Sequence, residues 1–152
     1  MKFYTNEETA FFLAGAIASL IIPTIKNGNR KAGHTEVPTD LILHVNHLLE
    51  PVIHHEIPSA VILYGRIFTR GEFSDIVVLQ NKNIEKQFMD AMQNQGKQRH
   101  EALGYIFGYS KSAIKQYLKD KSSHYEAPFE ELIIIKWNDE KNNPHLKKIA
   151  PK

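Results

Sequence analysis

The sequence predicts an α+β fold: a single compact domain with a small antiparallel sheet, a buried N-terminal helix and a C-terminal helical hairpin. Three observations favour this class. The chain opens with a long apolar run, its middle holds two β-rich runs around a short glycine-containing turn, and strand-like and helical stretches do not alternate strictly as in βαβ proteins. The length of 152 residues suits one domain, which we place at 1–137, followed by a polar tail at 138–152.

The first expected element is a helix over residues 6–22. Residues 10–22 are almost wholly apolar, and Asn6 precedes two glutamates, which is typical of an N-cap followed by an acidic first turn. Pro23 is expected to end the helix. Because this run of 13 residues falls short of the roughly 20 that span a bilayer, we expect this helix at the centre of the core and no membrane partner.

The next stretch, 26–38, has the Asn, Gly and Pro content of a loop. A second helix is expected to begin at Thr39 or Asp40, because the apolar residues that follow recur at helical spacing. Pro51 is expected to stop it.

Strand patterns follow the second helix. Residues 60–68 and 73–80 are rich in β-branched and aromatic side chains and flank a Thr-Arg-Gly turn, which predicts a β-hairpin. A helical stretch is expected over 83–95. The β-branched run 129–137 comes after a proline, and we expect it to form a buried strand that pairs with the hairpin.

The segment 99–121 has the most specific spacing in the chain and predicts two short helices joined by a tight turn. Gly104 stands where two helices could cross closely. Gly108 stands where the first helix must stop, because glycine accepts the left-handed conformation that ends a helix. Ser110 can cap the second helix, which runs through Ile114 and has a polar, basic outer face.

The spacing of Gly104, Gly108 and Ile114 resembles the helix-turn-helix of DNA-binding regulators, in which the first of these positions is usually alanine. The resemblance is confined to 99–121. It implies a small regulator whose second helix enters the major groove, and a homo-oligomer, since such proteins commonly bind as two-fold dimers. A helical hairpin that merely packs is the other interpretation. The residues that would contact DNA are Lys111, Ser112, Lys115, Gln116, Lys119 and Lys121.

Charge is distributed unevenly along the chain. The net charge is +2, yet residues 1–80 hold 6 basic and 8 acidic side chains, whereas residues 81–152 hold 13 and 9. Within 97–121, six basic residues stand against two acidic ones, the kind of local excess that phosphate contacts use. The chain has no cysteine, which excludes disulfides, thiolate zinc sites and a Cys nucleophile and fits a cytoplasmic location.

The alternative class is a non-enzymatic protein that binds an anionic, nucleotide-like small molecule or sequesters a host factor, for example a phage-encoded anti-defence protein. Cations would hold a phosphate, and aromatic faces would stack on a base. A projecting basic helix would favour nucleic acid, and a pocket lined by arginine and aromatic side chains would favour the small ligand. The candidate residues for this ligand are Arg66, Arg70, Arg99, His100, Tyr105 and Tyr109.

Metal binding and catalysis have weaker support. None of the eight histidines sits in a specific metal-binding spacing such as HExxH, so we expect no metal and no cofactor. The pattern at 108–112 resembles a Gly-x-Ser-x-Gly nucleophile elbow, but it follows an expected helix instead of a strand, and we expect no enzyme. The histidines that could most readily share a metal are His44, His47, His54 and His55.

Overall fold

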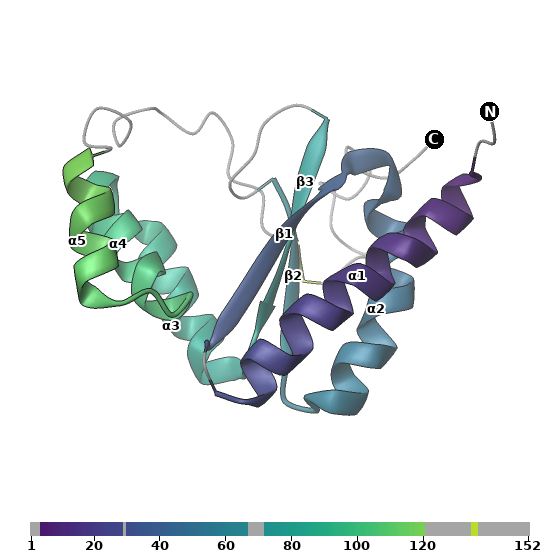
Figure 1. Ribbon diagram of the computed structural model, residues 1–152, viewed down its shortest axis with the longest axis horizontal. Coiled ribbons are helices and arrows are strands. Elements are labelled where there is room, and N and C mark those ends of the chain that lie inside the picture. Colours follow the sequence, from purple (N-terminus) through teal and green to yellow (C-terminus); the bar gives the residue numbers. More distant parts are fainter. Residues whose placement is uncertain (1–3, 29, 67–71, 121–134, 137–152) are drawn as a thin grey trace.

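A computed structural model describes residues 4–28, 30–66, 72–120 and 135–136 of the chain. It confirms the α+β fold (Figure 1). The helices are α1 (Asn6–Lys26), α2 (Ile42–Glu56), α3 (Lys82–Gln93), α4 (Gly96–Ile106) and α5 (Lys111–Asp120), with a 3-10 turn, η1 (Thr39–Leu41), before α2. The strands β1 (Ala32–Pro38), β2 (Val61–Gly65), β3 (Phe73–Leu79) and β4 (Ile135–Lys136) form one antiparallel sheet in the order β1-β3-β2-β4.

The sheet is a middle layer that is covered on both faces (Figure 1). Helices α1 and α2 cover one face, α3 and α4 cover the other, and α5 packs on α4 at the end of the molecule. Because successive side chains of a strand point to opposite faces, Ile62 and Val78 pack with α1 and α2, whereas Leu63 and Val77 pack with α3 and α4. Burial on both faces explains why apolar residues follow one another in both strands and do not alternate with polar ones.

The predicted hairpin is confirmed. β2 pairs with β3 in antiparallel register, with Val61 opposite Leu79 and Gly65 opposite Asp75. The expected third strand is present at β4, which pairs with the free edge of β2. The rest of the run 129–137 lies outside the described residues, as does the proposed tail 138–152.

The expectation of a loop over 26–38 is wrong. Its last seven residues form β1, which pairs with β3 along its whole length, from Ala32 opposite Leu79 to Pro38 opposite Phe73. β1 is an edge strand, and its composition is polar because only part of it is buried. Turn-forming residues therefore gave a misleading local signal, and pairing with β3 decided the conformation.

The expected helix ends are also corrected. Thr5, and not Asn6, caps α1: its hydroxyl accepts from the Glu8 N–H at 3.1 Å, and the Glu8 carboxylate accepts from the Thr5 N–H at 3.1 Å. Helix α1 continues through Pro23, and α2 continues through Pro51. Both prolines are exposed, so each ring projects into solvent and the helix loses one backbone hydrogen bond. Neither Thr39 nor Asp40 makes a capping hydrogen bond to α2, since both belong to the 3-10 turn.

Only one stripe of helix α1 is buried, which contradicts its expected place at the centre of the core. A stripe at helical spacing packs on α2 and the sheet, while Phe11, Phe12 and Leu20 are 65%, 57% and 75% exposed. The helix has 21 residues, and an 18-residue window within it has a mean hydropathy of 1.7, so it is long and apolar enough to cross a membrane by length and composition. The buried stripe consists of Ala10, Ala14, Ile17, Ile21 and Ile25.

Candidate nucleic-acid interface

The turn between α4 and α5 has the predicted local structure. Gly108 has φ +82°, its N–H donates to the Tyr105 carbonyl at 3.2 Å, and the Tyr109 N–H donates to the Gly104 carbonyl at 3.0 Å. These two hydrogen bonds form a Schellman motif, which satisfies the last carbonyls of α4. Glycine is the residue that adopts this conformation without strain, which is why α4 ends here.

Ser110 caps α5, as predicted. Its hydroxyl accepts from the Ala113 N–H at 3.1 Å, and its carbonyl accepts from the Ile114 N–H at 3.0 Å. The chain thus leaves α4, turns within two residues at Gly108 and Tyr109, and enters a new helix in which the amides of Ala113 and Ile114 are satisfied by Ser110. The direction of α5 is therefore determined by local hydrogen bonds.

The two helices cross at Gly104. A Cβ at this position would lie 2.8 Å from Ile114 Cγ1, a separation too short for two carbon atoms. Ile114 is buried and is the residue by which α5 packs on α4. The predicted close crossing is therefore present, and its tightness explains why this chain has glycine where alanine is the usual residue of the pattern.

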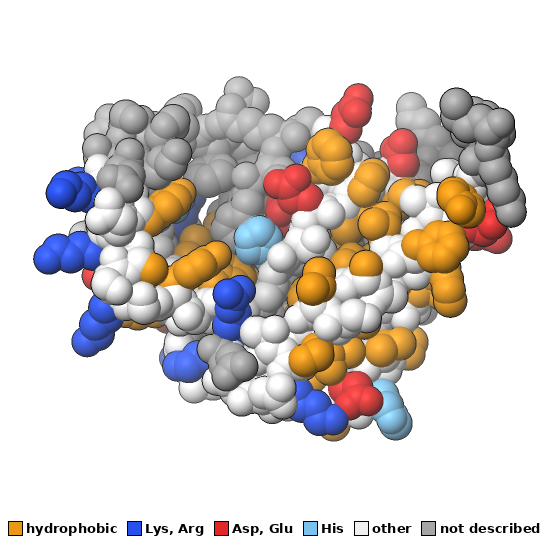
Figure 2. All heavy atoms as spheres, viewed as in Figure 1, with side chains coloured by type: hydrophobic (Ala, Val, Ile, Leu, Met, Phe, Trp, Pro, Cys, Tyr) orange, Lys and Arg blue, Asp and Glu red, His pale blue; other side chains and the backbone are white. Residues whose placement is uncertain are grey.

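The exposed surface of α5 is basic along one line. Lysines at positions 111, 115 and 119 are four residues apart, so they form one stripe along the helix. Figure 2 shows Lys and Arg side chains projecting from the end of the molecule that α5 forms. Lys121 lies outside the described residues. The exposed predicted contact residues are Lys111, Ser112, Lys115, Gln116 and Lys119.

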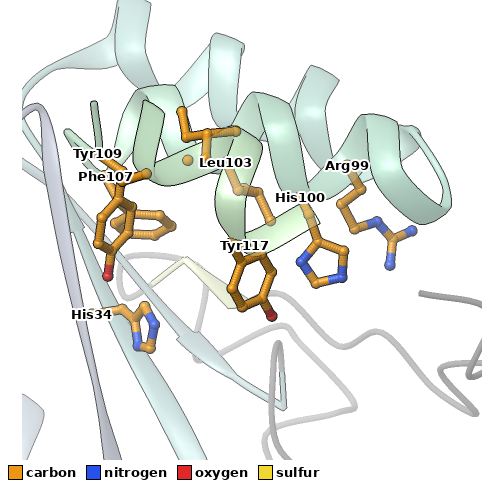
Figure 3. A pocket seen from close by; sticks show the side chains of 10 residues that line it. His34, Arg99, His100, Leu103, Phe107, Tyr109 and Tyr117 are labelled. Carbon is orange, nitrogen blue, oxygen red and sulfur yellow. The ribbon is translucent and has the colours of Figure 1, made fainter. Parts of the chain in front are cut away.

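A hollow of about 580 Å³ lies between α4, α5 and β1. Its size is within the range of small-molecule sites. Figure 3 shows Arg99, His100 and Leu103 on α4, Phe107 directly after α4, Tyr117 on α5 and His34 on β1 around it. The lining residues are His34, Arg99, His100, Leu103, Gly104, Phe107, Tyr109, Ala113, Ile114 and Tyr117.

The two histidines of the hollow pack against aromatic rings. His34 and Phe107 meet edge to face with ring centroids 5.2 Å apart, and His100 lies 5.7 Å from Tyr117. Burial against these rings lowers the pKa of His34, although Asp75 and Glu36 partly oppose it, and burial followed by the charge of Arg99 lowers the pKa of His100. Both shifts favour the neutral imidazole, which carries one hydrogen-bond donor and one acceptor.

Beside the hollow, Arg99 links α4 to α3 by hydrogen bonds. Its Nε–H donates to the Asn94 carbonyl at 2.7 Å, and its Nη2 donates to the Met92 carbonyl at 3.0 Å. These carbonyls belong to the C-terminal end of α3, so Arg99 fastens α4 to α3. Much of its hydrogen-bonding capacity is thus directed at the backbone and away from a ligand phosphate.

The residues predicted for a nucleotide-like ligand are only partly brought together. Arg99, His100 and Tyr109 line the hollow, whereas Tyr105 and Arg66 are not among its lining residues. Arg70 lies outside the described residues.

Four further groups at or beside the hollow were missed from sequence. Arg30 lies over the Tyr109 ring at 5.5 Å, and His34, Phe107 and Tyr117 line the hollow. Residues 30 and 34 fell in the supposed loop. Recognition of β1 would have placed His34 on the sheet beside α4.

In the histidine-rich segment of α2, His54 makes hydrogen bonds within the protein. His54 Nδ1 lies 2.9 Å from a Glu50 carboxylate oxygen, and its Nε2 lies 2.9 Å from the Ala60 carbonyl, so this ring links α2 to the start of β2. His44, His47 and His55 belong to the same helix. Within the described ranges, no group of three or more His, Cys, Asp or Glu side chains could hold a metal ion.

Comparisons with protein-family models, with curated proteins and with solved structures found no significant match. Two adjoining surfaces therefore carry the functional interpretation. One is the exposed basic stripe of α5, which suits phosphate, and the other is the aromatic hollow beneath the same helix, which suits a flat apolar group.

Proposed function

We propose that this protein binds double-stranded DNA through α5, as a small regulator. The observation that carries the proposal is a helix that packs on α4 through Ile114 and presents Lys111, Lys115 and Lys119 in one exposed stripe. Lysines spaced along a projecting helix can reach successive phosphates, and the release of their counterions supplies affinity. Ser112 and Gln116 flank the stripe and would reach base edges.

The turn supports the proposal because it fixes the direction of α5. A recognition helix must keep a defined angle to its scaffold so that its side chains stay in register with the groove. Here the Schellman motif at Gly108, the Ser110 cap and the contact of Gly104 with Ile114 define that angle together.

The test is binding to random duplex DNA at several salt concentrations. Replacement of Lys115 and Lys119 by Ala should weaken binding and reduce the slope of log K against log salt by about two units, one for each phosphate that these lysines neutralise. The matched control replaces Lys82 and Lys86, which are exposed and also four residues apart, on α3. It should leave the slope unchanged.

Gln116→Ala should instead relax sequence preference, at a cost of about 1–3 kcal/mol at one base pair of an enriched site. The DNA proposal is wrong if no duplex binds more tightly than about 100 µM at low salt, the weak limit of non-specific binding. It is equally wrong if the α3 control weakens binding as much as the α5 pair.

A second candidate function is the binding of a flat aromatic ligand in the hollow. The observation that favours it is the aromatic lining provided by His34, Phe107, Tyr109 and Tyr117. Since Arg99 is occupied by backbone carbonyls, this hollow suits the base of a nucleotide better than its phosphate.

Adenosine and adenosine monophosphate are suitable probes for this second candidate. They should bind with similar affinity, measured by calorimetry, and Ala113→Trp should abolish both interactions because the indole would fill the hollow. Binding of the monophosphate alone, unaffected by Ala113→Trp, would contradict this assignment.

A further inference from the structure

The outer face of α1 is apolar and exposed, although the helix belongs to a folded domain. Monomeric soluble proteins seldom expose large contiguous apolar patches without a function. Figure 2 shows hydrophobic side chains gathered over α1. Large residues lie toward both ends of this face and small ones at its middle: Phe11, Phe12, Gly15, Ala16, Ser19 and Leu20.

This order of large and small residues is self-complementary. A two-fold axis placed between Gly15 and Ala16 would bring Phe11 opposite Leu20 of a second, antiparallel copy, with the small residues at the crossing. A Cβ at Gly15 would meet no described atom within 4 Å, so space for a close helix approach is open there. The axis passes near the midpoint of the 21-residue helix, so both halves of α1 would be covered.

The charges at the ends of α1 favour the antiparallel arrangement. Glu7 and Glu8 lie in the first turn and Lys26 in the last, so an antiparallel copy brings carboxylates toward an ammonium group at each end. Lys26 also pairs with Glu56 at 2.6 Å, yet more than half of its side-chain surface remains exposed. A parallel copy would instead place like charges together. An anionic bilayer would meet the two glutamates with repulsion.

We infer that the outer face of α1 is the interface of a symmetric dimer formed with a second copy of this chain. Leu48 and Val52, which are exposed on the neighbouring α2, can add to the area that a stable interface requires, about 800 Å² on each partner. Helix α5 lies at the other end of the molecule (Figure 1), so dimer formation and DNA binding are separate properties with separate tests.

The experiment is sedimentation equilibrium of the full chain at increasing concentration. The wild type should show twice the monomer mass of 17.4 kDa. Leu20→Asp should give the monomer, because it places a charge in the apolar interface. Gly15→Leu should also give the monomer, because its side chain fills the crossing point without adding charge. Both positions are exposed, so neither substitution should disturb the fold. Both variants should therefore unfold at the same temperature as wild-type protein that has been diluted until it is monomeric.

Two results would overturn the inference. The first is a wild type that stays monomeric at about 200 µM, well above the micromolar affinity of a modest interface. The second is a dimer that survives both substitutions. If the monomeric wild type floats with phosphatidylcholine vesicles and Leu20→Asp does not, the face belongs to a membrane and the dimer is wrong.

Discussion

At the scale of single residues, the contact between Gly104 and Ile114 determines how closely α5 approaches α4. The space for even one methyl group is missing, since a Cβ at Gly104 would overlap Ile114 Cγ1 at 2.8 Å and Cδ1 at 3.0 Å. Both positions lie in a packed crossing, where the side chain of one helix sits on the backbone of the other. The effects of substitutions at these two positions on the free energy of unfolding should therefore be strongly coupled.

The effect of Gly104→Ala on the free energy of unfolding should change sign when Ile114 is replaced by Ala. In the wild type it should destabilise the protein by about 1 kcal/mol, because overpacking costs about 1–3 kcal/mol and the better helix propensity of alanine returns up to about 1. In an Ile114→Ala background the overlap is gone, and Gly104→Ala should stabilise by up to about 1 kcal/mol. Urea unfolding of the four proteins measures this cycle. Equal effects in both backgrounds would show that the crossing is loose.

Sequence reasoning worked best for residues whose role is set by their immediate neighbours. Gly108 and Ser110 could be assigned because a left-handed helix end and a hydroxyl cap depend on only a few residues. His34 could not, because its role arises from Phe107, which is more than seventy positions away in the chain. Long-range contacts of this kind leave no local pattern.

At the scale of elements, packing overrode a local signal at the two helix prolines and at β1. Pro23 and Pro51 were expected to end helices, yet both helices continue because their next turns still bury Ile25 and Ile53 in the core. β1 was mistaken for a loop because an edge strand needs few apolar residues. The strongly patterned hairpin of β2 and β3 was predicted correctly.

The packing of α4 and α5 around β1 should be sensitive to pH through His34 and His100. Burial lowers the pKa values of both histidines in the folded state. At a pH between these lowered values and about 6.5, the unfolded chain therefore binds more protons than the folded protein does. The stability that these neutral rings contribute is complete above about pH 6.5 and is lost as the pH falls through the folded values.

The urea concentration at the unfolding midpoint should therefore decrease as the pH is lowered from about 7.5 to about 5.5. Replacement of both histidines by Gln should make this decrease smaller. The control replaces His44 and His55, which lie on α2 away from the hollow. A double Gln variant with the pH dependence of the wild type would show that the lowered pKa values of these two rings do not cause it. Glu56, whose pKa is lowered by its hydrogen bond to Lys26 and then by the lysine charge, titrates below this window.

At the scale of the whole molecule, a sheet buried on both faces separates two different surfaces. The α1 side presents an apolar face suited to a second copy, and the α5 end presents a basic helix beside an aromatic hollow (Figure 2). The α+β class followed from sequence because apolar runs and the hairpin turn are strong signals. The hollow did not, since it is formed by three elements that are distant in the chain.

The most direct test of the central proposal is a titration of the ¹⁵N-labelled protein with duplex DNA, followed by amide chemical shifts. We predict that the amides of Lys111, Lys115 and Lys119 shift progressively while those of Phe11 and Leu20 do not. No shift on α5 at roughly millimolar duplex, about ten times the weakest expected dissociation constant, would contradict DNA binding through this helix.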